Sequence, residues 1–464
     1  MAFSPIYRRV RQVVSSGVGH EIMGINKKAR GTLHFTCFGQ TSTLFGAKMS
    51  SAILEAVSDQ QIEKRIQKHR TATTRLTIKT AKGVPLANQA VTIRQTNHEF
   101  LFGCNIFPLK KLSTPALEEG FQKRFAELLN YATVPFYWSG YEREEGQTQA
   151  ARLKEMATWC VAHDIRVKGH TLVYHQTIPE WSATKSFAEF KRLQLERVTR
   201  EVKEFAGLID IWDVTNETCW APGHLKGQHP VAKLTRKMGR VGIVKEAYGL
   251  ARKANPKATL VLNDCDPTPL YAKLVRESLA AKAAVDVVGI QSHMHKGYWG
   301  LERAWKVCEQ YAKFGRPLHF SELTILSGIL QKDHSWALTR TDWFSTAEGE
   351  ELQAKQVRDF YRLLFSHPAV AGITWWDFAD EGAWLGAPAG LVRKDMSPKP
   401  AYEELYKLIK KDWWTPEQKL MTDAKGVVEF AGFLGAHEVQ VKREKVAFSV
   451  DKAGKGSAVV RVKA

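Results

Sequence analysis

Two glutamates each end a short apolar run of the kind that forms buried strands. Glu217 ends the run IWDVTNE at 211–217, and Glu322 ends PLHFSE at 317–322. Side chains at the carboxyl ends of neighbouring parallel strands gather at one edge of a sheet. Two carboxyl groups in that position suit hydrolysis of a glycosidic bond, because one can protonate the leaving oxygen while the other attacks the sugar carbon or activates water.

Residues between 100 and 377 contain the elements that would position the two glutamates. Eight apolar runs rich in β-branched residues alternate with longer stretches whose apolar residues recur at helical spacing. This alternation predicts an α/β fold, a (β/α)8 TIM barrel rather than an open sheet. The predicted strands are Phe100–Ile106, Ala132–Tyr137, Val167–Tyr174, Ile209–Glu217, Thr259–Asp264, Val285–His293, Leu318–Thr324 and Val370–Asp377. Helices are predicted after them, for example at Ala116–Asn130, Leu153–His163, Phe187–Phe205 and Glu351–Ser366.

The two flanks of the predicted barrel alternate apolar and polar residues with a period of two. Residues 73–99 do so around a Lys82-Gly83 turn, which predicts a hairpin, and residues 419–463 repeat the pattern. Neither flank has enough strands to be stable alone, so we expect one small accessory β-sandwich built from both ends of the chain. The predicted domains are an N-terminal extension (1–72, with a helix at Asp59–Lys68), the N-terminal part of the sandwich (73–99), the catalytic barrel (100–411) and the C-terminal part of the sandwich (412–464).

The overall composition is that of a globular protein with a real core. The chain has 464 residues, of which 44% are hydrophobic and 25% charged. No run of eighteen apolar residues occurs, so no membrane partner is expected. The net charge of +19 is dispersed and no nucleic-acid-binding motif accompanies it. A solvated basic surface is the main interpretation, and attraction to a uronate-bearing glycan is the alternative.

The cysteines favour neither a disulfide framework nor a zinc knuckle. They are widely spaced and form no CxxC or CxH motif, so buried thiols are expected. The six positions are Cys37, Cys104, Cys160, Cys219, Cys265 and Cys308.

Several residues near the glutamates could bind a sugar or tune the protonation of a carboxyl group. Asn216 beside Glu217 could hold a sugar hydroxyl, although an Asn-Glu pair can also be a helix cap or a surface pair. Glu322 could instead be a buried structural carboxylate. His293 ends the predicted sixth strand and could hydrogen-bond Glu322, which would tune its protonation. His293 and His295 share a side of that strand, but no third ligand is evident, so we predict no metal site and no cofactor.

Aromatic side chains and a further histidine follow other predicted strands. His170 ends the third strand, four residues before Tyr174. Trp376 ends the eighth, and Trp384 follows in a glycine-containing loop. Tryptophan faces at strand ends can pack against the C–H groups of a pyranose, although large aromatic side chains are as often part of a core.

Taken together, these segments resemble glycoside hydrolase family 10, whose best-known members are endo-β-1,4-xylanases. They occur in the family's order across about residues 100–411. The matching stretches are GHTLVYH (169–175), PEW (179–181), WDVTNE (212–217), LND (262–264), GIQSH (289–293), SEL (321–323), Trp376, Trp384 and PKPAY (398–402).

The resemblance implies a retaining endo-acting mechanism on xylan or a related β-linked polysaccharide. Glu217 would be the acid/base and Glu322 the nucleophile, with their carboxyl groups roughly 5–5.5 Å apart. Asn216 would hold the 2-hydroxyl of the sugar in the −1 subsite, and His293 would hydrogen-bond Glu322. The other residues expected to bind substrate are His170, Tyr174, Gln291, Trp376 and Trp384.

Three positions depart from the family pattern. After the second strand the family carries a glutamate, an asparagine and a lysine that bind the sugar at −2. Residues 130–142 here contain no lysine, and apolar and aromatic residues replace the Glu-Asn pair. Thr324 stands where an aspartate often supports the histidine, and Tyr174 replaces a usual tryptophan. These departures leave two alternatives: a β-glycosidase with an altered −2 subsite, acting on a different, acidic or decorated glycan or from chain ends, and a non-catalytic carbohydrate-binding barrel.

Localisation and oligomeric state stay open. The substrate class implied by the resemblance is typical of secreted or periplasmic enzymes. No signal peptide is visible, because Arg8, Arg9 and Arg11 are not followed by an apolar core and a small-residue cleavage site.

Overall fold

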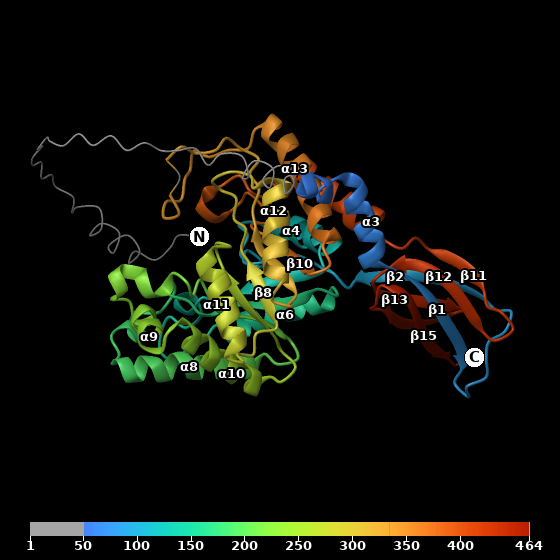
Figure 1. Ribbon diagram of the computed structural model, residues 1–464, viewed down its shortest axis with the longest axis horizontal. Helices are drawn as coiled ribbons and strands as arrows, with labels where there is room; N and C mark the ends of the chain where they lie inside the picture. Colours follow the sequence, from blue (N-terminus) through green and yellow to red (C-terminus); the bar gives the residue numbers. More distant parts are fainter. Residues whose placement is uncertain (1–50, 334, 464) are drawn as a thin grey trace, which may run out of the picture. The chain divides into compact units, whose positions relative to one another are not determined.

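Eight parallel strands close into a barrel in the computed structural model, which describes residues 51–333 and 335–463 (Figure 1). Their order around the barrel is β10-β3-β4-β5-β6-β7-β8-β9, so each strand lies beside its neighbour in sequence. The predicted TIM barrel is therefore confirmed, and each predicted strand is present with slightly shifted ends. The strands are β3 (Leu101–Asn105), β4 (Tyr131–Pro135), β5 (Arg166–Val173), β6 (Ile211–Asn216), β7 (Thr259–Asp264), β8 (Val287–Ile290), β9 (Leu318–Leu323) and β10 (Val370–Trp375).

Helices connect these strands, and several begin at side-chain caps. Thr114, Ser186, Thr268 and Thr346 each accept a hydrogen bond from a backbone N–H in the first turn of the helix that follows. These caps explain why the helices begin where they do. The helices are α4 (Pro115–Leu128), α5 (Trp138–Tyr141), α6 (Ala150–Ala162), α7 (Glu180–Ala183), α8 (Phe187–Glu204), α9 (Pro230–Met238), α10 (Arg240–Ala254), α11 (Pro269–Ala280), α12 (Gly300–Ala312), α13 (Ala347–Ser366) and α14 (Pro400–Lys407).

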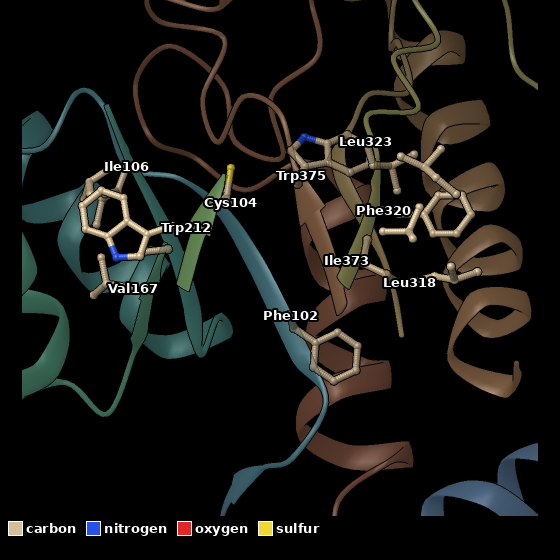
Figure 2. Packing of buried hydrophobic residues seen from close by; sticks show 14 of the residues in the cluster. Phe102, Cys104, Ile106, Val167, Trp212, Leu318, Phe320, Leu323, Ile373 and Trp375 are labelled. Atoms are coloured by element: carbon tan, nitrogen blue, oxygen red, sulfur yellow. The ribbon is translucent and has the colours of Figure 1, made fainter. Parts of the chain in front are cut away.

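Large buried side chains fill the space around the barrel strands. Trp212 on β6 is fully buried and belongs to the same apolar cluster as Val167 of β5 and Ile106, which are labelled in Figure 2. Its ring packs edge-on against Phe136 with 4.8 Å between ring centroids. This packing requires a glycine at 169, because a Cβ there would come within 2.3 Å of the Trp212 ring. The apolar packing thus holds β5 and β6 together just before the residues that could do chemistry.

A second core lies between two small sheets that combine both ends of the chain. One sheet has the order β12-β1-β15 and the other β11-β2-β13-β14, and Figure 1 shows β1 (blue) beside the later strands. Apolar side chains of both sheets share one cluster, which confirms the accessory β-sandwich. The strands are β1 (Thr71–Thr80), β2 (Ala90–His98), β11 (Gln418–Met421), β12 (Val427–Phe433), β13 (Gly435–Val441), β14 (Glu444–Val450) and β15 (Gly454–Val462).

The predicted hairpin at 73–99 is wrong. The chain does turn after β1, where the Thr80 N–H donates to the Val84 carbonyl (2.8 Å), but β1 and β2 then enter opposite sheets. Each strand buries alternate residues toward the shared core, such as Ile78 of β1 and Ile93 of β2. A period of two reports that one face is buried, and it does not distinguish a hairpin partner from a partner across a sandwich.

Residues 1–50 of the predicted extension, together with Cys37, lie outside the described residues. The helix expected at Asp59–Lys68 is present as α3 (Asp59–Arg70), and the chain from Leu54 onward forms one compact unit. Within the part of the chain that the structure describes, no helix is long and apolar enough to cross a bilayer. The five described cysteines are free thiols, and all except the half-buried Cys265 are buried.

Arg70, at the junction of α3 and β1, connects these elements to the barrel. Its guanidinium donates to the carbonyl oxygens of Phe365 (2.6 Å), His367 (2.7 Å) and Val370 (2.6 Å), at the end of α13 and the start of β10. Burial lowers the pKa of Arg70 to about 10 despite the opposing charge of Glu99. The three carbonyls belong to buried residues and would lack these partners without the guanidinium.

We expect Arg70→Met to lower the free energy of unfolding by about 2–4 kcal/mol, because it leaves three buried carbonyl groups without their charged donor. Urea denaturation of the full chain measures this. Arg75→Met, at an exposed position on β1, is the control and should change stability by less than about 0.5 kcal/mol. Equal unfolding midpoints for the two variants would contradict the role given to Arg70.

Candidate active site

Glu217 and Glu322 both lie at the carboxyl end of the barrel strands. Glu322 is the penultimate residue of β9, and Glu217 is the first residue after β6. Glu217 has a φ of +52°, a left-handed conformation that a residue with a side chain rarely adopts. Such backbone strain persists only where the surrounding structure enforces it, and it concentrates at functional sites.

A chain of amide side chains links the two carboxyl groups. Gln291 Nε2 donates to Glu217 Oε1 (3.3 Å) and to Asn216 Oδ1 (3.1 Å). Asn263 Nδ2 donates to the same Asn216 oxygen (2.8 Å) and to Glu322 Oε1 (2.7 Å). Both donors use the oxygen of Asn216, so its amide nitrogen has no partner among the described residues. That nitrogen is a ready donor for a ligand between the two carboxyl groups.

Glu322 is held as an anion. Its Oε2 lies 3.0 Å from His293 Nε2, and its Oε1 lies 4.0 Å from His170 Nδ1. Burial by itself raises the pKa of this carboxyl group, but His170, His293 and Lys168 outweigh it and lower the pKa below its usual value. The Glu322 carboxylate is therefore ionised at neutral pH.

Glu217 is held in its protonated form. Tyr174 donates its hydroxyl to Oε1 (3.0 Å). Burial, and then the negative charges of Asp264 and Glu322, raise the pKa of Glu217 to about 8, although the hydrogen bonds from Gln291 and Tyr174 act in the opposite direction. Asp264 is itself buried, which raises its pKa to about 6. Two carboxyl groups whose pKa values are pushed apart in one site can serve as an acid and a nucleophile.

His293 has a hydroxyl partner where the sequence indicated that it would lack a charged one. Thr324 Oγ1 donates its single proton to the Trp376 carbonyl (2.8 Å) and lies 3.1 Å from His293 Nδ1. Because that proton is already used, Nδ1 of His293 must donate to the Thr324 oxygen. The contact orients the ring so that Nε2 faces Glu322.

Trp376 and Trp384 border the same space. The Trp376 ring packs edge-on against His170, with 5.5 Å between centroids, and the half-buried Trp384 ring lies 4.8 Å from His293. Asp377 positions Trp384 by accepting its backbone N–H (2.6 Å). The adjacent Trp375 instead belongs to the buried core.

The structure thus gathers every sequence-predicted site residue around Glu217 and Glu322, and their roles stay predictions. Sequence reasoning missed several residues that contact this set. LND at 262–264 was noted as a motif, but its polar residues were given no role. A lysine within an apolar strand was the available signal for Lys168, whose Nζ lies 2.8 Å from Asp213 Oδ2. The missed residues are Tyr137, Lys168, Asp213, Asn263, Asp264 and Asp377.

No group of three or more histidine, cysteine, aspartate or glutamate side chains within 51–333 and 335–463 is arranged to hold a metal ion.

The model of glycosyl hydrolase family 10 matches residues 95–408, more than half of the chain. Endo-1,4-beta-xylanase B of Paenibacillus barcinonensis is 30% identical over 244 residues, which cover 50% of this chain and 71% of that protein. Endo-1,4-beta-xylanase A of Caldicellulosiruptor saccharolyticus is 27% identical over 289 residues, covering 56% and 79% respectively.

Solved structures share the barrel. Xylanase 10B from Thermotoga petrophila RKU-1, solved in complex with xylobiose, superimposes with a TM-score of 0.57 at 20% identity. The match covers 68% of this chain and 95% of that one. At this identity the likeness supports the fold alone.

The raised pKa of Glu217 predicts a pH-dependent effect of Glu217→Gln on stability. An unfolded chain ionises this group above its usual pKa of 4.5, whereas the folded state resists ionisation until about 8. The wild type should therefore lose stability between these pH values, and the variant should not. At about 1.4 kcal/mol per pKa unit, and with some solvent at the side chain, the variant should gain about 2–4 kcal/mol relative to wild type at pH 9 compared with pH 4.

Thermal and urea unfolding at both pH values measure this difference. Glu196→Gln, at an exposed position on α8, is the control for loss of one carboxyl group. The same stability difference between Glu217→Gln and wild type at both pH values would contradict the raised pKa.

Proposed function

The chain belongs to glycosyl hydrolase family 10, and on that basis we propose that this glycoside hydrolase cleaves xylan, or a related β-linked polysaccharide, by a retaining, endo-acting double displacement. Glu217 is the acid/base and Glu322 the nucleophile. The observation that carries this assignment is the opposite displacement of their pKa values, raised to about 8 for Glu217 and lowered for Glu322.

The first step forms a covalent glycosyl-enzyme. A carboxylate oxygen of Glu322 attacks the anomeric carbon as the bond to the leaving oxygen breaks, and Glu217 gives its proton to that oxygen. Glu217 is then ionised and serves as a base. It takes a proton from water as the water oxygen attacks the same carbon, and Glu322 leaves as a carboxylate. Two inversions at one carbon retain its configuration.

The amide of Asn216 supports this reaction in both steps. Its oxygen is held by Asn263 and Gln291, so its nitrogen points away from them and donates to the sugar 2-hydroxyl. Asn263 also donates to Glu322, so the same residue positions both Asn216 and the nucleophile. Trp376 and Trp384 provide the apolar border of the −1 sugar.

Xylan is proposed because relatives are named endo-1,4-beta-xylanases and a structural neighbour was solved with xylobiose. The rebuilt region after β4 favours a second candidate, a β-glycosidase with different glycone recognition or an exo mode. Glu142, the carboxylate of that region, is bound by Arg200 (2.6 Å) and by Trp138 Nε1 (2.9 Å) and so does not serve a sugar. A non-catalytic sugar-binding barrel is disfavoured, because binding needs no such separation of pKa values.

We expect wild type to release xylo-oligosaccharides with retained β-configuration. Glu217→Gln should lower kcat/KM on xylan by about 10²–10⁴-fold, because the leaving oxygen loses its proton donor. The same variant should keep most of its kcat/KM on a 2,4-dinitrophenyl β-glycoside, whose leaving group needs no proton in the first step. Glu322→Ala should turn over neither substrate.

Product analysis and NMR of the first-formed anomer measure these outcomes on plain xylan, glucuronoxylan and other β-glycans. Release of products from glucuronoxylan alone, or from another glycan alone, would favour the second candidate function. An inverted product from wild type, or full activity of Glu217→Gln on the natural polysaccharide, would contradict the mechanism.

Asp264→Asn should move the alkaline limb of kcat/KM to lower pH by roughly one unit, or about 1.4 kcal/mol of charge repulsion. Activity is lost as the pH rises through the pKa of Glu217, because the acid must be protonated. After burial, the charge of Asp264 is the largest cause of the raised pKa of Glu217. Removing that charge lets Glu217 lose its proton at lower pH. An unmoved limb would contradict this coupling, and Asp266→Asn, at the exposed position two residues on, is the matched control.

A further inference from the structure

Tyr137 is held rigidly just beyond the end of β4. The carbonyl of its neighbour Phe136 accepts a hydrogen bond from the buried Arg197, and the Phe136 N–H donates to the His170 carbonyl (2.6 Å). The Tyr137 carbonyl accepts the N–H of Tyr141 (2.9 Å), the last residue of the short helix α5. The backbone around Tyr137 therefore has little freedom to move.

The side chain of Tyr137 lies among aromatic side chains of the candidate site. Its ring packs edge-on against Phe107, with 5.8 Å between centroids, and tilts against Tyr174 at 6.2 Å. Burial, followed by the charges of Glu322 and Glu217, raises the pKa of the phenol well above its usual value. The hydroxyl thus keeps its proton and lies within electrostatic reach of the two groups that flank the sugar.

Both ring nitrogens of His170 already have partners. Nδ1 lies 2.7 Å from Asp213 Oδ2, a carboxylate that Lys168 keeps ionised, so Nδ1 is the donor. Nε2 lies 3.2 Å from the Tyr137 hydroxyl. His170 could therefore contact a sugar only by giving up one of these two bonds.

The Tyr137 hydroxyl donates to Nε2 where His170 is neutral and accepts the Nε2 proton where His170 is protonated, so the contact exists in both states. The phenol oxygen keeps a lone pair that can accept a proton from a sugar hydroxyl. A buried series of polar contacts thus runs from Lys168 through Asp213 and His170 to Tyr137 and orients the Tyr137 hydroxyl.

Resting on the proposed function, we propose that Tyr137 is the residue that contacts the −1 sugar on this side of the site, and that His170 is a positioning residue that acts through it. Asn216, on β6, takes the 2-hydroxyl. Tyr137 approaches from β4 and takes the adjacent 3-hydroxyl. Its ring also bounds the glycone side together with Phe107.

The test pairs an enzyme variant with a substrate variant. Tyr137→Phe removes only the phenol oxygen, and a 3-deoxy aryl β-xyloside removes only its proposed partner. Wild type should prefer the parent xyloside over the deoxy compound by about 10–100-fold in kcat/KM, because the deoxy compound leaves a polar group without a partner. In Tyr137→Phe this preference should shrink to about threefold or less, since neither compound then finds the hydroxyl.

Two further variants distinguish a residue that contacts the sugar from a residue that positions it. Tyr402→Phe removes the hydroxyl of a buried tyrosine on α14, which donates to the Arg124 carbonyl (3.0 Å), and should keep the wild-type preference. His170→Asn should reduce the preference as Tyr137→Phe does, and the double variant should be no worse than the poorer single one. Such non-additivity is the signature of one residue acting through another.

The outcomes are distinguishable from failure of the proposed function. Undiminished discrimination in Tyr137→Phe, or additive losses in the double variant, would overturn the assignment of Tyr137 while the hydrolysis itself stands. If wild type hydrolyses only β-glucosides, the same comparison is made between the parent glucoside and its 3-deoxy analogue. Failure of wild type to hydrolyse any aryl β-glycoside would overturn the proposed function, and the role of Tyr137 with it.

Discussion

Two carboxyl groups in one buried site repel each other unless one keeps its proton and the other has compensating partners. Here Glu217 keeps its proton, because burial and the neighbouring Asp264 and Glu322 make its ionisation costly. Glu322 is compensated by His170, His293 and Lys168, which outweigh the same burial. The asymmetry follows from the elements that carry each group: Glu217 leaves β6 toward another acid on β7, whereas Glu322 faces imidazoles from β5 and the end of β8. The barrel therefore favours opposite protonation states for two residues of the same type.

This arrangement stores unfavourable free energy that the rest of the fold must offset. Lys168 and Asp213 form a fully buried ion pair, which seldom stabilises a protein compared with an apolar core. Glu217 adds backbone strain through its left-handed conformation. The packing of Trp212 against β5 and the attachment of α3 through Arg70 lie outside the reacting centre and strengthen the scaffold. The residues that strengthen the scaffold are thus different from those that the proposed mechanism uses.

The sequence predicted the fold well where burial alone decides the pattern. Eight apolar runs became eight strands, and residues at their ends, such as Glu217 and Glu322, came together because parallel strands present their carboxyl ends at one face. The hairpin failed because alternation shows that a face is buried but not which strand lies opposite. The Tyr137–His170 contact could not be predicted either, since it depends on how Arg197 holds the chain after β4.

The contacts also explain how the segment after β4 could differ from the family pattern without disturbing Glu217 and Glu322. The amide bridge through Asn216 and Asn263 depends on β6, β7 and β9. The segment after β4 depends instead on α8, where Arg197 binds the Phe136 carbonyl and Arg200 binds Glu142. Substitutions in that segment can therefore change the side chains on that side of the site without displacing the carboxyl groups of Glu217 and Glu322. His170 contacts Tyr137 of the segment after β4 and lies 4.0 Å from Glu322 Oε1. A substitution in that segment can therefore still affect Glu322 through His170.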